Sequence, residues 1–211
     1  MEKIILIGAG GHCRSIIDSI NELKSFEIVG IVDKKEKKYS ELNTDKVFSD
    51  EELYSLYKYG IKNAFIAIGS IGYPNLRIKI YNLLKSIGYC FPTIIDSTAV
   101  VSCSAKVEEG VFIGKGAIVN TNSIIKKQCI INSGSIVEHD CKIDEFVHVA
   151  PGAALSGGVS IGRGTHIGTN AAVIQNIQVG KNVLIGAGSV IIKNVKDGIK
   201  VYGNPGREVN L

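Results

Sequence analysis

The chain has 211 residues, long enough for one large or two small domains and for a hydrophobic core that needs no disulfide bonds. Its 24 Lys and Arg residues against 20 Asp and Glu residues give a net charge of +4, and no basic stripe or tail points to a nucleic acid partner. The five cysteines form no CxxC pair, which argues against a disulfide framework or a zinc ribbon, and no run of eighteen apolar residues or signal-peptide core is present. We therefore expect a cytoplasmic protein that does not bind membranes.

Two kinds of sequence meet near Cys90. Seven of the eight tyrosines precede this point, and sixteen of the 24 glycines follow it. We therefore expect one domain over residues 1–90 and a second over residues 91–211.

The first domain alternates apolar runs with segments of helical spacing. Ser49 and Glu52 match a capping box, which opens one of these helices. The alternation predicts a small Rossmann-like βαβαβ layer, a fold that binds ligands at the carboxyl ends of its strands. The expected strands are 3–7, 27–32 and 64–68, and the expected helices are 16–23, 49–60 and 75–86.

From Ile95 onward the chain has a period of six. Every sixth residue from Ile95 to Ile191 is aliphatic, over seventeen consecutive positions, and the residue four places after each is mostly small. This period fits neither an α-helix nor a meander of hairpins, but it predicts a parallel β-helix in which each hexad supplies a strand and a turn. Three hexads make a coil of eighteen residues, so residues i and i+18 are stacked in neighbouring coils.

The hexads that begin Ile-Gly or Val-Gly at positions 113, 161, 167, 179 and 185 resemble those of the hexapeptide-repeat acyltransferases. With the N-terminal strand and Gly8-Ala9-Gly10-Gly11-His12, the whole chain is similar to the NeuD/PglD-like sugar O- and N-acetyltransferases. The resemblance implies a left-handed β-helix, a homotrimer with active sites at subunit interfaces, acetyl-CoA as co-substrate without a metal, and a sugar acceptor that is nucleotide-linked.

His139 occupies a turn position outside the aliphatic ladder, between Glu138 and Asp140. An imidazole held by a carboxylate suits a general base, although a surface histidine on a turn is the alternative. The resemblance implies that His139 and Asp140 are the catalytic pair, and either Asp140 or Glu138 is expected to hold the ring. The coil repeat places Gly157 and Gly158 beside His139 and Asp140, where they leave room for a thioester and where a free N–H can bind its oxygen.

His148 and His166 are eighteen residues apart, so we expect two stacked imidazoles about 4.8 Å apart. The resemblance implies that His148 lines the acyl-CoA groove, whereas His166 is more typical of a packed rung. The cofactor-binding set implied by the resemblance is completed by two hexads and the C-terminal tail: Ile167, Gly168, Ile185, Gly186, Pro205 and Arg207.

The glycine-rich turn after the first strand has Cys13 where the dinucleotide fingerprint requires its third glycine, which disfavours NAD. The backbone of such a turn still binds phosphate groups. The turn glycines Gly8, Gly10 and Gly11 are therefore substrate-binding candidates; Lys34 could contact a diphosphate, and the resemblance adds His12 and Asp33.

We therefore expect an acetyl-CoA-dependent N-acetyltransferase that acts on a nucleotide-linked amino sugar by direct transfer. Cys141 lies at a small inward position, which favours packing over a nucleophile. O-acetylation of sialic acid or a related sugar is the alternative, followed by a zinc enzyme like the γ-class carbonic anhydrases and by a non-enzymatic scaffold.

Overall fold

The computed structural model describes residues 1–33 and 47–209, so Lys34 lies outside the described residues. The chain divides into two compact units, Met1–Gly69 with Asn75–Ile94, and Ser70–Pro74 with Ile95–Leu211. The division lies four residues after the expected boundary at residue 90. Ser70–Pro74 belongs to the second unit, where the Ser70 carbonyl accepts a hydrogen bond from His148.

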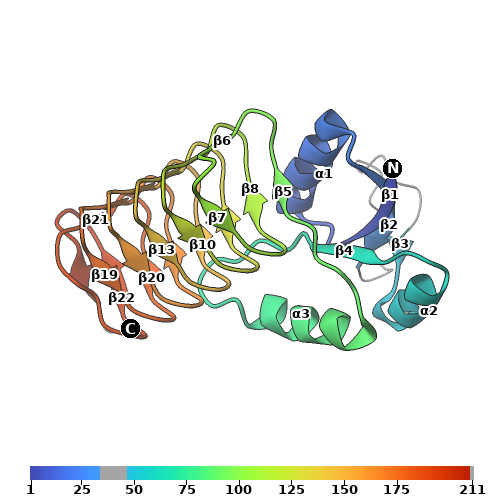
Figure 1. The fold of residues 1–211 in the computed structure, drawn as a ribbon. Helices are drawn as coiled ribbons and strands as arrows, with labels where there is room; N and C mark the ends of the chain where they lie inside the picture. The colour runs from blue at the N-terminus through green and yellow to red at the C-terminus, as the bar shows by residue number, and fades with distance from the viewer. Residues whose placement is uncertain (34–46, 210–211) are drawn as a thin grey trace. The chain divides into compact units, whose positions relative to one another are not determined.

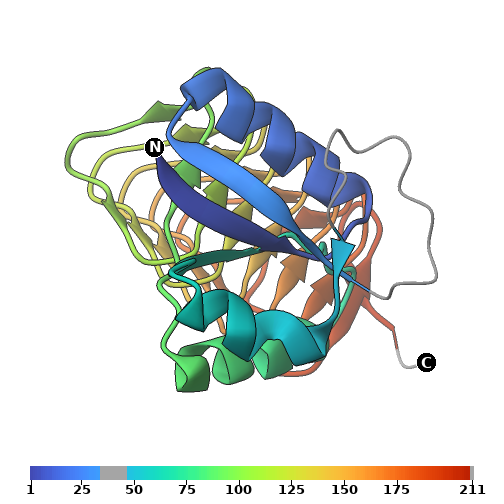
Figure 2. The ribbon, with the colours of Figure 1, turned by 90° about the vertical axis from the view of Figure 1, so that its right-hand side faces the viewer.

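The first unit is a parallel α/β layer with strand order β3-β2-β1-β4. Helix α1 lies on one face of the sheet, and α2 and α3 lie on the other (Figure 2). The central strand β1 is buried on both sides from Ile4 onward, as its continuous apolar run predicts. The elements are β1 Glu2–Ile7, α1 Gly11–Leu23, β2 Phe26–Val32, β3 Val47–Phe48, a 3₁₀ turn η1 Asp50–Glu52, α2 Leu53–Lys58, β4 Asn63–Ile66 and α3 Asn75–Ile87.

The predicted capping box is present, with the Glu52 carboxylate accepting from the backbone N–H of Ser49 at 2.7 Å. The cap opens a 3₁₀ turn before α2, and α2 is shorter than the expected helix of residues 49–60. Strand β3 was not expected because a two-residue strand carries no periodicity.

The second unit is a left-handed parallel β-helix (Figure 1). Each of the seventeen two-residue strands from β5 to β21 ends on one of the aliphatic residues of the six-residue repeat. The strands are β5 Ile94–Ile95, β6 Val100–Val101, β7 Lys106–Val107, β8 Phe112–Ile113, β9 Ile118–Val119, β10 Ile124–Ile125, β11 Ile130–Ile131, β12 Ile136–Val137, β13 Lys142–Ile143, β14 His148–Val149, β15 Ala154–Leu155, β16 Ser160–Ile161, β17 His166–Ile167, β18 Ala172–Val173, β19 Gln178–Val179, β20 Leu184–Ile185 and β21 Val190–Ile191, followed by β22 Lys200–Tyr202 and β23 Arg207–Glu208.

Every third strand joins the same sheet, so the β-helix has three faces. Face 1 contains β5, β8, β11, β14, β17, β20, β22 and β23; face 2 contains β6, β9, β12, β15, β18 and β21; face 3 contains β7, β10, β13, β16 and β19. The register pairs residue i with residue i+18, as in Ile136 with Ala154, which confirms the predicted coil length.

The interior of the β-helix is filled by the aliphatic residue of each strand and by the small residue at each corner. Val137, Leu155 and Cys141, for example, are fully buried. From Gly110 to Gly188, every sixth residue has a positive φ, because the chain must turn sharply at each corner. In the described part of the chain, no helix is long and apolar enough to cross a membrane.

Candidate active site

The turn 138–141, between β12 and β13, forms a corner where face 2 meets face 3. Here His139 Nδ1 lies 2.8 Å from Asp140 Oδ2, and the two side chains are 56% and 59% exposed. Asp140 has φ +60°, a left-handed conformation that Asp tolerates better than most residues. The hydrogen bond occupies Nδ1, so the ring presents Nε2 as its available nitrogen.

Glu138 holds the backbone of the turn and not the ring. Its Oε2 atom accepts hydrogen bonds from the Asn120 amide at 3.1 Å and from the backbone N–H of His139 at 3.2 Å. Both acids flank His139 in the sequence, which left the choice open, and the structure selects Asp140 as the residue that orients the imidazole.

Gly157 lies against the imidazole, as the coil repeat predicts. A Cβ atom on Gly157 would come within 2.5 Å of both Cε1 and Nε2 of His139. The N–H of Gly158 is not free, because it donates to the His139 carbonyl at 2.9 Å within the coil ladder. Gly157 is therefore the glycine that lies against the Nε2 edge of the ring.

The charges of this corner are set by local contacts. Hydrogen bonds from His139 and then from Asn122 lower the pKa of Asp140, so its carboxylate stays charged to lower pH than an isolated one. Cys141 is fully buried, and this burial raises the pKa of its thiol to about 11. A buried thiol of that pKa is a packing residue and a poor nucleophile, in agreement with its inward position.

His148 and His166 are paired on face 1 with ring centroids 4.8 Å apart, at the expected spacing, but in an edge-to-face arrangement. His148 is only 8% exposed, and its two ring nitrogens contact the Ser70 carbonyl at 2.7 Å and the Asn132 amide at 3.2 Å. His166 is buried as well, and this burial lowers its pKa. In this chain His148 is therefore held in place by both of its nitrogens.

The predicted cofactor residues fall into two groups. Gly168 and Gly186 donate their N–H groups to the next coil, and a Cβ at either position would collide with that coil, so close packing accounts for both glycines and for the inward Ile167 and Ile185. Pro205 and Arg207 instead line a C-terminal cavity of about 330 Å³ together with Lys193. The two cations outnumber the one carboxylate of this lining, Glu208, and the net positive charge suits a phosphate group.

The glycine turn of the first unit ends β1 at the carboxyl edge of the sheet. Gly8 has φ +97°, and a Cβ there would overlap Ile68. Asp33 Oδ2 accepts the Ala9 N–H at 3.0 Å, so this carboxylate also stabilises the turn. A cavity of about 610 Å³ opens at this edge, lined among others by Gly8, Asp33 and Asp50.

The remaining substrate candidates lie in or beside this turn. Gly10 and Gly11 are exposed, with open space where a Cβ would stand. Burial, and to a lesser extent the charge of Arg77, lowers the pKa of His12 to about 4, so His12 is neutral at physiological pH.

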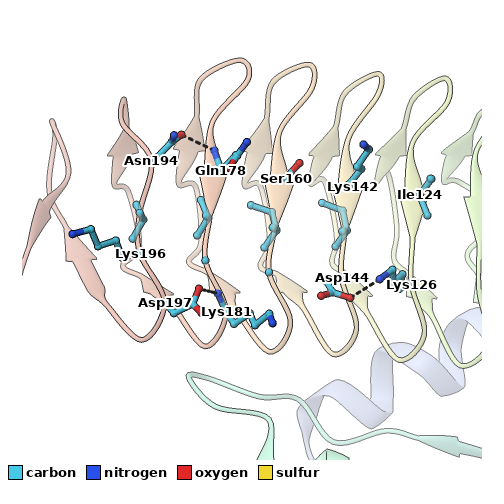
Figure 3. A pocket seen from close by; sticks show the side chains of 16 residues that line it. Ile124, Lys126, Lys142, Asp144, Ser160, Gln178, Lys181, Asn194, Lys196 and Asp197 are labelled. Atoms are coloured by element: carbon cyan, nitrogen blue, oxygen red, sulfur yellow. Dashed lines mark hydrogen bonds and ion pairs between the residues drawn. The ribbon is translucent and has the colours of Figure 1, made fainter.

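A third cavity, of about 630 Å³, lies along face 3 and was not predicted (Figure 3). Lys142, Ser160 and Gln178 project from successive strands of this face, and Lys126 forms an ion pair with Asp144 at 3.0 Å on its border. The hexad repeat identifies which residues point outward but not whether the strands between two corners form a hollow. Within residues 1–33 and 47–209, no group of three or more His, Cys, Asp or Glu residues is placed to hold a metal ion.

Comparison with known proteins identifies the family of this chain. The PglD N-terminal domain family matches residues 3–84, and the bacterial transferase hexapeptide family (six repeats) matches residues 158–204. PerB, a perosamine N-acetyltransferase from Caulobacter crescentus solved in complex with CoA and GDP-perosamine, is 31% identical over 100% of this chain and 98% of its own, with a TM-score of 0.92. This chain is a PglD-like hexapeptide acetyltransferase.

Two further relatives of this hexapeptide acetyltransferase are similar over nearly their whole length. The acetyltransferase domain of PglB from Neisseria gonorrhoeae, in complex with acetyl coenzyme A, is 33% identical over 99% of each chain, with a TM-score of 0.90. WeeI from Acinetobacter baumannii is 25% identical over 99% of this chain and 100% of its own, with a TM-score of 0.86. Membership of this family favours acetyl transfer over the zinc enzyme and the scaffold considered from the sequence.

Proposed function

We propose that this enzyme transfers the acetyl group of acetyl-CoA to the amino group of a nucleotide-linked amino sugar. The observation that carries the proposal is the His139–Asp140 pair, whose Nδ1–Oδ2 contact of 2.8 Å leaves Nε2 at an exposed corner against Gly157. The GDP-perosamine and acetyl coenzyme A bound by the Caulobacter and Neisseria relatives support both substrates.

The proposed reaction is a direct transfer with His139 as general base. Asp140 holds the Nδ1–H tautomer, so Nε2 carries the lone pair that accepts a proton from the sugar nitrogen as this nitrogen attacks the thioester carbonyl. The new C–N bond forms a tetrahedral oxyanion, and the Gly157 N–H at this corner would donate a hydrogen bond to it. The C–S bond then breaks, and CoA leaves as its thiolate. The buried Cys141, with its raised pKa, supports transfer without an acyl-enzyme.

The C-terminal cavity and the sheet edge of the first unit are the proposed ends of the two substrates. Pro205 and Arg207 would contact the phosphates of CoA, and Gly157 and Gly158 its acyl end. His148 lies on face 1, across the β-helix from that corner, so within one chain it would not contact the acyl group. The nucleotide part of the sugar would occupy the cavity beside Gly8 and Asp33. Acetyl-CoA as co-substrate also favours the expected cytoplasmic location, as do the five free cysteines.

We further propose that the enzyme is a homotrimer with active sites at its subunit interfaces. The outward residues of face 2 are all apolar: Val100, Ile118, Ile136, Ala154, Ala172 and Val190. Val100 is 63% exposed, and Ile174 and Ile192, at the corner that carries His139, are 41% and 43% exposed. A continuous apolar face of this kind is typical of an interface between subunits. Face 3, by contrast, presents Lys142, Ser160 and Gln178.

A substrate panel tests the reaction. The enzyme is incubated with acetyl-CoA and with GDP-, UDP- and dTDP-linked 4-amino sugars or free sialic acid, and the products are identified by mass spectrometry. We expect acetylation of an amino sugar and a decrease in kcat of at least about 100-fold in His139→Asn, while this variant still shows a thermal shift with acetyl-CoA. Acetylation of sialic acid alone would assign a hydroxyl acceptor, and His139→Asn with most of its kcat would rule out the base.

A further inference from the structure

Asn122 lies one coil before Asp140, at the same place in the turn. Its amide Nδ2 is 3.4 Å from Asp140 Oδ1, while Oδ2 of the same carboxylate is 2.8 Å from Nδ1 of His139. We propose that Asn122 is a positioning residue, which fixes the second oxygen of Asp140 and thereby orients His139. The inference rests on the base role proposed above for His139.

The carboxylate needs this second contact because it stands in solvent. The Asp140 side chain is 59% exposed, and the turn of the following coil has Gly158 at the equivalent position, so no side chain holds the carboxylate from that side. An exposed carboxylate with a single hydrogen-bond partner moves among several rotamers and readily replaces that partner by water. With an amide on Oδ1, rotation of the carboxylate breaks two hydrogen bonds instead of one, and Oδ2 stays at the imidazole.

Asn122 is itself held in place by the coil that precedes it. Its backbone N–H donates to Ser104 Oγ at 3.1 Å, and Ser104 Oγ lies 2.7 Å from Thr121 Oγ1. Ser104, Asn122 and Asp140 are thus stacked at intervals of eighteen residues and lead across three coils to the imidazole. These contacts fix the backbone of Asn122. Its amide group is therefore held in a defined position, unlike the amide of an asparagine on a flexible loop.

Backbone conformation alone does not account for the amide. Asn122 has φ +58°, and at this corner position the fold uses Gly in several other hexads, such as Gly116 and Gly134. Of the residues that tolerate this conformation best, Gly, Asn and Asp, only Asn carries a neutral donor for the carboxylate above it. Asn182, with φ +51° at a different corner, provides the matched case of an exposed asparagine far along the chain from His139.

The proposal has an electrostatic consequence that a purely structural role lacks. The hydrogen bond from Asn122 helps to lower the pKa of Asp140, after the larger effect of His139. The ionisable groups around Asp140 are His139, Glu138 and Cys141 of its own turn, since turns 120–123 and 156–159 contain none. Removal of the amide raises the pKa of Asp140 and leaves its carboxylate less firmly fixed at His139 Nδ1.

The test uses Asn122→Gly, which keeps the left-handed conformation and removes the donor, and Asn122→Asp, which has the same shape and replaces the donor by a second acid. Asn182→Gly is the control. The first readout is the tautomer of His139 from ¹⁵N NMR of histidine-labelled full-length protein, assigned with His139→Asn and measured at one pH above neutrality. We expect the Nδ1–H form to make up a larger share of the neutral ring in the wild type and in Asn182→Gly than in either Asn122 variant.

The second readout is turnover with acetyl-CoA and GDP-perosamine. We expect kcat of Asn122→Gly to fall about fivefold, the effect of one ordinary hydrogen bond in the transition state, with KM for acetyl-CoA unchanged. In an Asp140→Asn background, Asn122→Gly should have no further effect. Tautomer and kcat like those of Asn182→Gly, or an effect that persists without Asp140, would overturn the role of Asn122. The NMR readout decides this even if His139→Asn keeps its activity, an outcome that removes only the base assignment.

Discussion

Gly157 determines how much of the imidazole a substrate can reach. The three atoms nearest to a Cβ at this position belong to the His139 ring, with Cε1 and Nε2 at 2.5 Å, and Gly157 does not have a left-handed φ. The backbone therefore accepts a side chain at residue 157, but the ring does not. The glycine is explained by its contact with His139 and not by the turn.

We predict that Gly157→Ala displaces the imidazole and lowers kcat by roughly 100-fold, because a base moved by about 1 Å loses its alignment. The melting temperature should stay close to that of the wild type. The same substitution in a His139→Ala background meets no ring and should change neither kcat nor the melting temperature relative to His139→Ala. Wild-type kcat in Gly157→Ala would show that the ring lies elsewhere in solution.

Sequence reasoning located the centre of this corner but not its hydrogen bonds. The eighteen-residue repeat places Gly157 beside His139, and this position is confirmed by the contact between them. The repeat does not distinguish Asp140 from Glu138, because both are adjacent to His139 and the choice depends on side-chain rotamers. It also does not reveal that the Gly158 N–H is used by the coil ladder.

At the scale of the element, the corner of each hexad carries a second pattern besides the aliphatic one. The residues with positive φ recur every six positions from Gly110 to Gly188, and nearly all are Gly, Asn or Asp. Gln128 and Phe146 are the two others in this series, and both side chains are buried. The left-handed conformation costs an ordinary residue about 1–2 kcal/mol, and the free energy gained by burying these two side chains offsets that cost.

The recurrence of Gly and Asn at one place of each hexad is visible in the sequence, because these residues are typical of a turn with positive φ. The aliphatic ladder alone sufficed to predict the strands, because each inward residue must be apolar to fill the core. The short strand β3 and the hollow on face 3 were beyond the same reasoning. Neither feature is set by a periodic requirement of the core.

We predict that Asn182→Ala destabilises the β-helix by about 1 kcal/mol, whereas Asn182→Gly is close to neutral. Asn182 is exposed with φ +51°, so the difference between the two variants reports the backbone and not lost packing. Chemical denaturation followed by circular dichroism measures both free energies of unfolding. Equal values for the two variants would mean that the left-handed corner does not constrain the choice of residue.

At the scale of the whole molecule, the proposed trimer rests on face 2. Its outward residues are apolar from Val100 to Val190, and the turn with His139 borders the strand that carries Ile136. A single subunit would expose this face to water. Packing of three copies through face 2 would bury it and bring a partner's surface next to each His139 corner.

We predict that Ile136→Lys dissociates the trimer, because it would bury a charge in the middle of the apolar face. Sedimentation velocity should show three times 22.6 kDa for the wild type and a single subunit for Ile136→Lys, with an unchanged circular dichroism spectrum. The matched control is Ser160→Lys, which adds the same charge to the outward row of face 3.

Turnover measurements on the same variants then show whether the active site needs the trimer. If a partner completes the substrate crevice, Ile136→Lys loses turnover although the His139–Asp140 pair is untouched, whereas Ser160→Lys remains a trimer. A single subunit that keeps the wild-type kcat would place the whole active site within one chain. A wild-type protein of 22.6 kDa in solution would leave face 2 without the proposed partner. Sedimentation velocity and turnover together therefore decide whether packing through the apolar face completes the active site or only holds the subunits together.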